Sequence, residues 1–466
     1  RNEQLESVTS DPYGAQTDFY SRHRDALAKE NMYEGSFHYT HTYGKEREFG
    51  VDYTYSSESE DEVNDYATTR TTGSSSNREL VWDANYLHVA TLHATHRIND
   101  CLKLSAGYEM EFLRAEQNYH LSDWDGTAFI PNADESSDFT HLRAINSLYV
   151  TAEAGLGAWK VLAGLRGEYV SLENRLISEG NTTKRHYSNV YPTFHVSRRL
   201  DAKNELLLSY SLRVNRPEGE DMNPFAERIN PLSLQSGNPN LMPEKIHSVE
   251  AGWQWRGQSA LLLATAYYRY LTNEITEVSR YIDNGVLLTT KENMSSSQSA
   301  GLELIFDGSV ARWLGFNANL NGFYNQIDAS NINVASGTGH ERGRHKDAFA
   351  WSALVNANVT PFRNFMVQLN FRFRSARLVP QGRRNADSRI NIGMKYDIPS
   401  INLAVTASVT DLFDTYRKSS TIETADFRQE IDQRRNPRIF SVGLVWKFGG
   451  GHTGKDKNKL EYDEGM

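Results

Sequence analysis

The sequence predicts an all-β protein, a transmembrane antiparallel up-and-down β-barrel with about 17 strands. Three observations predict it: many segments alternate apolar and polar residues, their connections alternate between short and long, and 11% of the residues are aromatic. Strands of a spanning barrel face lipid and lumen in turn, which allows a mean hydropathy as low as −0.61. No stretch approaches the roughly 18 uninterrupted apolar residues that a membrane helix needs.

The last segment shows the alternation most clearly. One face carries Phe440, Val442, Leu444, Trp446 and Phe448, and the other carries Ser441, Gly443 and Lys447. Only one orientation keeps Lys447 out of lipid, so the apolar side chains are expected to face hydrocarbon. Similar splits occur over residues 102–111, 316–321, 351–359 and 367–374. Residues 86–94 and 260–270 are apolar on both faces, and their orientation stays open.

The connections alternate between tight links and long polar loops. The tight links lie at 44–47, 97–100, 155–158, 200–204, 256–258, 307–312, 361–364 and 397–400. Loops are predicted at 56–79, 120–138, 172–186, 215–242, 328–347, 378–386 and 414–436, with a shorter one at 283–285. Short turns on one rim and long loops on the other are typical of bacterial outer-membrane barrels, in which the turns face the periplasm.

This topology divides the chain into an outer loop segment over residues 1–30, the barrel over residues 31–449, and a charged tail over residues 450–466. The tail, which begins within a run of glycines, is expected to be disordered. An odd number of strands would leave an unpaired sheet edge in lipid. We therefore expect further strands to precede residue 1 in the whole barrel.

Composition and motifs exclude several classes of function. A net charge of −9 argues against a nucleic-acid partner, and the single cysteine, Cys101, excludes an intramolecular disulfide. No nucleophile elbow, metalloprotease motif or phosphate-binding glycine loop is present, so we expect neither an enzyme nor a cofactor. His88, His93 and His96 do not form a metal site, because His93 points away from the other two on a strand.

The segment from residue 208 to residue 250 is the most informative. Asn-Pro pairs at 223–224, 230–231 and 238–239 mark successive turns. The third belongs to the run Gly237 to Glu244 (GNPNLMPE), which precedes a strand containing Glu250. Here the chain resembles the outer-membrane β-barrel domain of TonB-dependent receptors, and the resemblance extends through Asp411 to Asp414 (DLFD) and to the closing strand at Phe448.

The resemblance implies a 22-stranded barrel around an N-terminal plug, which the TonB energy-coupling complex pulls so that a bound ligand can pass. Neither a plug nor a TonB-box segment stands in this sequence. Arg213, Arg216, Glu244 and Glu250 are candidates for holding such a plug by ion pairs, or for simply lining a solvated lumen. Phe448 looks like the signal that the barrel assembly machinery reads, and an ordinary interfacial aromatic is the alternative.

One outer loop carries further candidates for ligand contact. His340, Arg342 and His345 are close in sequence, and a metal or ligand could be bound there; an ordinary solvated loop is the alternative. Loop charges are mixed, so no ligand charge is implied.

We expect an outer-membrane receptor that imports a small-molecule, glycan or peptide nutrient. Outer-membrane lipid surrounds it, and a surface lipoprotein is a candidate partner. The alternative is a passive porin or a surface adhesion barrel. A soluble glycan-binding protein is a third possibility, which detergent partitioning would test.

Overall fold

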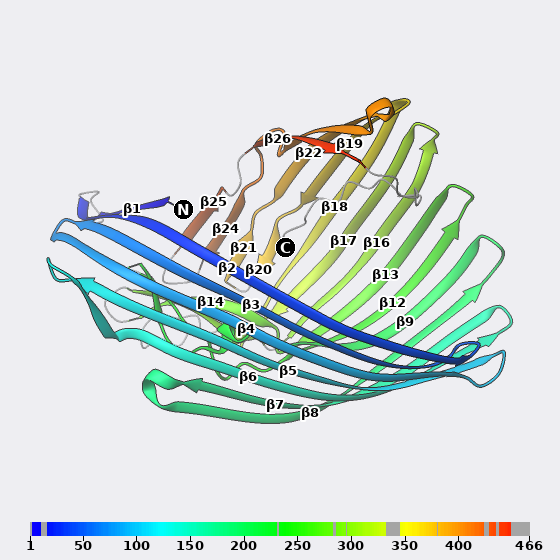
Figure 1. Ribbon diagram of the computed structural model, residues 1–466, viewed down its shortest axis with the longest axis horizontal. Coiled ribbons are helices and arrows are strands. Elements are labelled where there is room, and N and C mark those ends of the chain that lie inside the picture. Colours follow the sequence, from blue (N-terminus) through cyan, green and yellow to red (C-terminus); the bar gives the residue numbers. More distant parts are fainter. Residues whose placement is uncertain are drawn as a thin grey trace.

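The chain folds into one large antiparallel sheet that curves around a central space like the wall of a barrel (Figure 1). The computed structural model describes residues 2–10, 16–230, 233–282, 286–294, 296–331, 345–379, 381–423, 428–434 and 438–448. Within these ranges, 18 strands form the sheet. In sheet order they are β1 (Asn2–Ser10), β2 (Gln16–Gly44), β3 (Arg47–Arg70), β4 (Gly73–Arg97), β5 (Leu102–Trp124), β6 (Phe129–Leu156), β7 (Trp159–Leu176), β8 (Asn181–Arg199), β9 (Asn204–Asn215), β12 (Glu244–Arg256), β13 (Ala260–Thr272), β16 (Ser296–Ala311), β17 (Leu314–Asp328), β18 (His345–Phe362), β19 (Phe365–Arg374), β22 (Asp387–Ile398), β23 (Leu403–Thr410) and β26 (Ile439–Trp446).

Each strand of the sheet pairs with the next one along the chain, from β1 beside β2 to β23 beside β26. The predicted up-and-down topology is therefore confirmed. The predicted strands correspond to β2 through β26 in this order, and β1 is an addition. Tight turns join alternate pairs, and Glu46, Asn364 and Asn402 in these turns have φ of 52°, 67° and 51°. Positive φ is what such turns require, and asparagine adopts it at a lower cost than most residues.

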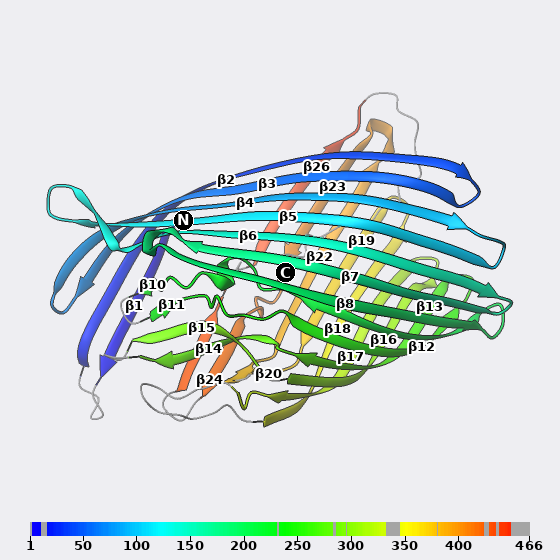
Figure 2. The same ribbon diagram turned by 90° about the horizontal axis from the view of Figure 1, so that it is seen from below.

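Three predicted loops are wrong in their secondary structure, because the strands continue far beyond the alternating segments (Figure 2). The ranges 56–79, 120–138 and 172–186 consist mostly of paired strand, with turns only at their tips. Glu60 and Asp83, for example, face each other in register across β3 and β4. Where water lies on both sides of a strand, both faces can be polar, so the alternation disappears although the hydrogen-bonded ladder continues.

The predicted outer loop over residues 1–30 is also strand where the structure describes it. β1 pairs with the first part of β2, and that part of β2 pairs with the end of β3, with Tyr20 opposite Arg70. This region lies at the end of β2 remote from its tight turn. Its position on the outer side is in keeping with the predicted topology.

The apolar residues predicted to face lipid on the closing strand lie on the same face as exposed apolar residues of its neighbours. Phe440, Val442 and Leu444 of β26 are 71%, 79% and 69% exposed. An exposed apolar surface follows the same face of neighbouring strands, and it includes Leu104, Leu148, Leu165, Leu208, Leu302 and Leu320. A soluble protein rarely exposes so continuous an apolar surface, whereas lipid would cover it.

Two orientations that the sequence left open are now determined. On β13, Tyr268 is exposed on the lipid side, and Tyr267 is buried on the lumen side, where its hydroxyl donates to Asn321 Oδ1 at 2.9 Å. On β4, Leu92 faces outward while His93 Nδ1 lies 3.2 Å from Asp52 Oδ2 in the lumen. Both faces look apolar in sequence because the lumen wall contains apolar side chains as well.

Hydrogen-bonded aromatic side chains mark both edges of the apolar band. Near the tight turns, the indole N–H of Trp446 donates to the carbonyl of Ile401 at 3.0 Å. Toward the other rim, the hydroxyl of Tyr108 donates to Asn146 Oδ1 at 2.6 Å, and that of Tyr268 donates to Gln298 at 2.9 Å. Tyrosine and tryptophan at both interfaces are expected of a membrane-spanning barrel.

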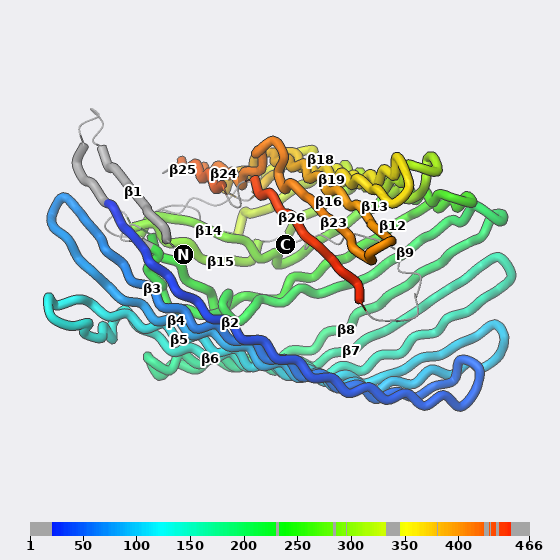
Figure 3. The backbone as a smooth tube through the Cα atoms, turned by 45° about the horizontal axis from the view of Figure 1, so that its top comes forward, coloured from blue at the N-terminus to red at the C-terminus, as the bar shows by residue number. Residues whose placement is uncertain are grey.

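Segments of the long connections form two smaller sheets. The first consists of β10 (Glu227–Asn230), β11 (Ser233–Gln235), β14 (Ile275–Tyr281) and β15 (Leu287–Asn293), and it lies within the curve of the large sheet (Figure 3). The second consists of β20 (Arg377–Val379), β21 (Gly382–Arg384), β24 (Lys418–Glu423) and β25 (Arg428–Gln433). Short 3-10 turns occur at η1 (Ile177–Glu179), η2 (Glu220–Met222) and η4 (Pro399–Ile401). In the described part of the chain, no helix is long and apolar enough to cross a membrane.

Candidate ligand-binding mouth of the lumen

The connection between β9 and β12 is tied to the lumen wall where it begins. Arg216 forms an ion pair with Glu168 of β7. Arg166 of the same strand contacts Glu168 at 2.7 Å and Glu109 of β5 at 2.6 Å. The side chains of Glu168 and Arg216 are 5% and 17% exposed, so this pair is largely shielded from water. Such shielded, charge-assisted bonds fix the geometry of the chain that leaves β9.

The GNPNLMPE run folds back on the η2 turn. Gly237 N–H donates to the carbonyl of Asn223 at 2.7 Å, and Asn238 N–H donates to that of Asp221 at 2.6 Å. A Cβ atom at residue 237 would lie 2.5 Å from the Asp221 carbonyl oxygen, so the close approach requires glycine. The Asn-Pro turns therefore hold the η2 turn at a defined place in the mouth.

The end of this run is joined to the next connection by side-chain hydrogen bonds. Glu244 is 8% exposed and accepts from the N–H of Ile275 at 2.6 Å and from the Asn215 amide at 2.8 Å. Asn293 accepts from Met242 N–H at 2.8 Å and donates to the Met242 carbonyl at 2.9 Å. These bonds bring β14 and β15 against the start of β12.

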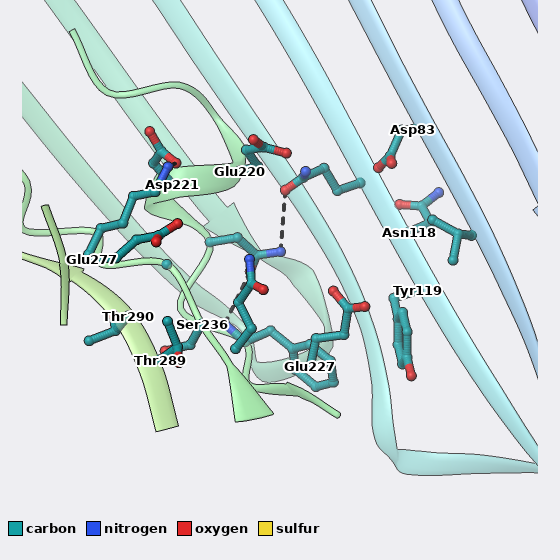
Figure 4. Close-up of a pocket in the computed structure, with 17 residues that line it drawn as sticks. Asp83, Asn118, Tyr119, Glu220, Asp221, Glu227, Ser236, Glu277, Thr289 and Thr290 are labelled. Carbon is teal, nitrogen blue, oxygen red and sulfur yellow. Dashed lines mark hydrogen bonds and ion pairs between the residues drawn. The ribbon is translucent and has the colours of Figure 1, made fainter. Parts of the chain in front are cut away.

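An acidic cavity of about 320 Å³ lies between these elements and the lumen side of β4 and β5 (Figure 4). We call it the acidic cavity; its charged lining residues are Asp83, Glu220, Asp221, Glu227, Glu277 and Lys291. Lys291 forms an ion pair with Asp221. Amide and hydroxyl groups of Gln117, Asn118, Asn223, Ser236, Thr289 and Thr290 also line it. The volume is within the range of small-molecule sites, and its polar lining suits a ligand rich in hydrogen-bonding groups.

Two carboxyl groups of the acidic cavity have pKa values above their ordinary range. Burial, together with the nearby carboxylates of Glu79 and Asp83, raises the pKa of Glu227 to about 7. Burial together with Glu220 and Glu60 raises the pKa of Asp83 to about 6. Both residues lie beyond the outer aromatic band, so they face the aqueous mouth. A positively charged or hydrogen-bond-donating ligand group would favour their ionised forms.

One wall of the acidic cavity is aromatic. The rings of Tyr119 on β5 and Phe225 have centroids 5.8 Å apart. The Tyr119 hydroxyl donates to Glu79 Oε2 at 3.1 Å, and the Asn64 amide donates to Glu79 Oε1 at 2.8 Å. Glu79 is thus held by the wall and is not available to a ligand in the way that Asp83 and Glu227 are. Among the described residues, no group of histidine, cysteine and acidic side chains has metal-site geometry.

Comparison with known proteins agrees with this architecture. Residues 38–446 match the model of the outer membrane protein beta-barrel family. The chain belongs to that family. A comparison with curated proteins gives no match.

Several solved barrels have the same fold. The ferric yersiniabactin uptake receptor FyuA from Yersinia pestis is 11% identical with a TM-score of 0.57, over 96% of this chain and 74% of that one. The copper transporter OprC is 13% identical with a TM-score of 0.58, over 96% and 75%. The ferric-catecholate import receptor Fiu from E. coli K12 is 13% identical with a TM-score of 0.56, over 92% and 64%.

These matches confirm the resemblance to TonB-dependent receptors inferred from the GNPNLMPE run. The protein is an integral β-barrel of the outer membrane. Its structural neighbours are transport receptors rather than enzymes. At identities this low, the similarity establishes the fold of the barrel. The ligand has to be inferred from the residues of this chain.

The barrel does not bring the four candidate plug-contacting residues together as ion pairs. Arg216 pairs with Glu168, and Glu244 is occupied by Ile275 and Asn215. Glu250 accepts from the Ser248 hydroxyl at 3.1 Å and lies 3.7 Å from Arg269. Arg213 is exposed on the lumen side of β9, and it has no ion-pair partner among the described residues. A role in holding a plug stays a prediction for all four.

Of the other candidates, His345 and Phe448 are described, and neither lines the acidic cavity. His345 is the exposed first residue of β18, opposite Asp328 in register. His340 and Arg342 lie outside the described residues. Phe448 is 82% exposed beside Trp446, with ring centroids 5.4 Å apart, and its role as an assembly signal stays a prediction.

Sequence reasoning missed the residues that line the acidic cavity. Asp83 lies on β4, on the same face as His93, and counting in twos from His93 toward Gly73 would have placed it in the lumen. Glu227 lies inside the predicted 215–242 loop, and its sequence neighbours carry no signal for burial. Its position follows from the ion pair of Arg216 with Glu168 and from the close packing of Gly237 on the η2 turn.

Proposed function

We propose that this outer-membrane barrel is a receptor that binds a nutrient ligand in the acidic cavity and imports it through the lumen. The observation that supports the proposal most is the position of two connections, residues 216–243 between β9 and β12 and residues 273–295 between β13 and β16. Their described parts lie inward of β4 and β5 and line, at the outer mouth, a cavity large enough for a small molecule. A polar cavity at the entrance is what a receptor needs in order to concentrate a scarce ligand.

Energy coupling is part of the proposal through the resemblance to TonB-dependent receptors. In that arrangement a plug domain inside the barrel contacts the TonB complex, and Arg213 and Glu250 on the lumen wall are available to such a domain. A surface lipoprotein beside the mouth would extend ligand capture. Siderophores, metal complexes, corrinoids, oligosaccharides and peptides are all candidate ligands.

The competing proposal is a passive porin or an adhesion barrel. A porin conducts polar solutes in proportion to their concentration, and an adhesion barrel conducts none. Neither needs the close ties that Glu244 and Asn293 make between separate connections.

Growth experiments can identify the ligand. A strain that lacks the gene is compared with the same strain complemented by the full-length gene, on media in which one nutrient of each candidate class is limiting. We expect one class to require the gene, and Asp83→Asn with Glu227→Gln to raise the concentration needed for growth. Leu148→Ala, on the lipid face, is the matched control. Equal growth of deletion and complemented strains on every class would contradict import.

A further inference from the structure

A second pocket lies outward of the acidic cavity, and its charge is opposite. It encloses about 160 Å³ and is lined by Arg22 of β2, Arg70 of β3 and Arg228 of β10, with a single carboxylate, Glu135 of β6. We call it the arginine pocket. On β4 it is lined by Ser75 and Asn77, whereas the acidic cavity is lined by Val81 and Asp83, which lie deeper in the barrel. Tyr119 lines both pockets and forms the boundary between them.

Strand β10 separates the two charges. Its consecutive residues Glu227 and Arg228 line different pockets, the carboxylate in the acidic cavity and the guanidinium in the arginine pocket. This strand is held against the wall by two bonds. Arg22 Nη1 donates to the carbonyl of Ile229 at 2.6 Å, and Arg228 Nη2 forms an ion pair with Glu135 at 2.6 Å.

Two arginines of the arginine pocket, Arg22 and Arg228, have hydrogen-bond donors to spare. A guanidinium carries five N–H donors in a planar fork, and the bonds to Ile229 and Glu135 use one donor of Arg22 and one of Arg228. Arg22 also stacks over the Tyr66 ring at 3.5 Å, which orients its plane. The hydroxyl groups of Thr68 and Ser75 lie in the same lining. Such a set of donors matches the oxygens of a carboxylate or a phosphate.

The acidic cavity below sets the charge of the rest of the ligand. A second anionic group there would meet Asp83 and Glu227 in a partly shielded site, where like charges repel strongly. A neutral polar or cationic group would be accepted.

We propose that the arginine pocket binds one anionic group, a carboxylate or a phosphate, at the outer end of the ligand, and that the part below Tyr119 carries no negative charge. This inference rests on the proposed function and specifies its ligand class. A short peptide, with a carboxylate at one end and an ammonium group at the other, has this distribution of charge.

Calorimetric titration of the purified full-length protein in detergent micelles tests the proposal. The probes are triglycine, triglycine amide, which lacks the carboxylate, and inorganic phosphate. We expect phosphate to bind saturably at millimolar concentration, and triglycine to bind at least about tenfold more tightly than its amide, because the amide loses a charge-assisted fork. Equal affinities for triglycine and its amide, or no saturable binding of either anion, would overturn the proposal.

Three substitutions and one control locate the site. Arg22→Gln, Arg70→Gln and Arg228→Gln should each weaken triglycine binding by about tenfold. Arg78→Gln, on the outward face of β4 where the guanidinium pairs with Asp65 at 2.7 Å, should leave binding unchanged. Unchanged affinity in all three pocket variants would refute the assignment even if the barrel proves to import a nutrient.

A lipopolysaccharide phosphate presents the same chemistry, so a further arm distinguishes the two sources. Purified lipopolysaccharide is titrated into the same protein, with and without triglycine. The lumen position of the pocket predicts that lipopolysaccharide does not compete with triglycine. Competition that Arg228→Gln abolishes would assign the pocket to lipid and overturn the proposal.

Discussion

The side chain of Gln381 makes two hydrogen bonds to the backbone of Ser279, as a neighbouring strand would. The side-chain oxygen of Gln381 accepts from Ser279 N–H at 2.7 Å, and its amide donates to the Ser279 carbonyl at 2.8 Å. Both residues are buried, at 5% and 4% exposure. Next to them, Val278, Met294, Ile327 and Ala329 form a small apolar core against Leu378. Three parts of the chain, the β13–β16 connection, the end of β17 and the β19–β22 connection, are thereby joined into one folded unit at the mouth.

Substitution of Gln381 by alanine should loosen this unit and leave the barrel intact. It leaves a buried N–H and a buried carbonyl without partners, which costs about 2 kcal/mol or more. Hydrogen exchange over residues 275–293 should become faster by about thirtyfold, since 1.4 kcal/mol corresponds to about tenfold. Ser279→Ala keeps both backbone bonds and serves as the control. Equal exchange in the two variants would show that the pairing contributes nothing.

Glu168→Gln should detach the start of the 216–243 connection from the wall. The carboxylate lies between Arg166 and Arg216. Removing it leaves the shielded Arg216 guanidinium without its ion-pair partner, at a cost of about 3 kcal/mol, while Arg166 keeps its ion pair with Glu109. Limited proteolysis of the detergent-solubilised protein should then cleave within this connection. Glu250→Gln is the control, because Glu250 is 39% exposed and lies 3.7 Å from Arg269, so its loss should cost under about 1 kcal/mol. Cleavage at the same rate in the two variants would show that the ion pair between Glu168 and Arg216 does not hold this connection.

The docking of β10 should depend on pH through Glu227. Its pKa is raised by burial to about 7 when β10 is docked. The docked state therefore binds the proton more tightly than the open state, so docking is strongest below the ordinary glutamate pKa and weakens as pH rises through about 7. Hydrogen exchange of residues 227–230, corrected for intrinsic rates, should be slower at about pH 5 than at about pH 8. Glu227→Gln should abolish this difference, and its persistence would assign the effect to another group.

Phe448→Ala should reduce the amount of folded barrel in the outer membrane if the assembly machinery reads this residue. Phe440→Ala, at a comparably exposed position on β26, which ends two residues before Phe448, is the control. Heat-modifiable mobility on gels distinguishes folded from unfolded barrel. A similar loss in both variants would favour an ordinary interfacial role for Phe448.

The membrane-facing part of this fold could be predicted because lipid and lumen impose different side chains on the two faces of a strand. Phe440 and Lys447 show that difference directly, and Tyr267 and Tyr268 do not, because both faces of β13 accept tyrosine. The outer ends of β3 and β4, which extend beyond the alternating segments, could not be predicted for a related reason. Around Glu60 and Asp83 water is near both faces, so nothing in the sequence distinguishes a paired strand from a loop.

The candidate site was less accessible to prediction than the strands. Glu244 was recognised from its motif, and its lumen-side burial is observed, but its partners were not foreseen. Asp83 and Glu227 meet only because the intervening strands curve and the 216–243 connection turns inward. Such contacts depend on the curvature of the whole sheet rather than on local pattern.

Import of a ligand captured in the acidic cavity can be measured as the initial rate of uptake into intact cells. The labelled nutrient identified by growth is supplied over a range of concentrations, with and without a protonophore. We predict saturable uptake that the protonophore abolishes and that Asp83→Asn with Glu227→Gln shifts to higher concentration. Uptake that rises linearly with concentration and survives the protonophore would rule out energy-coupled import and identify a passive pore.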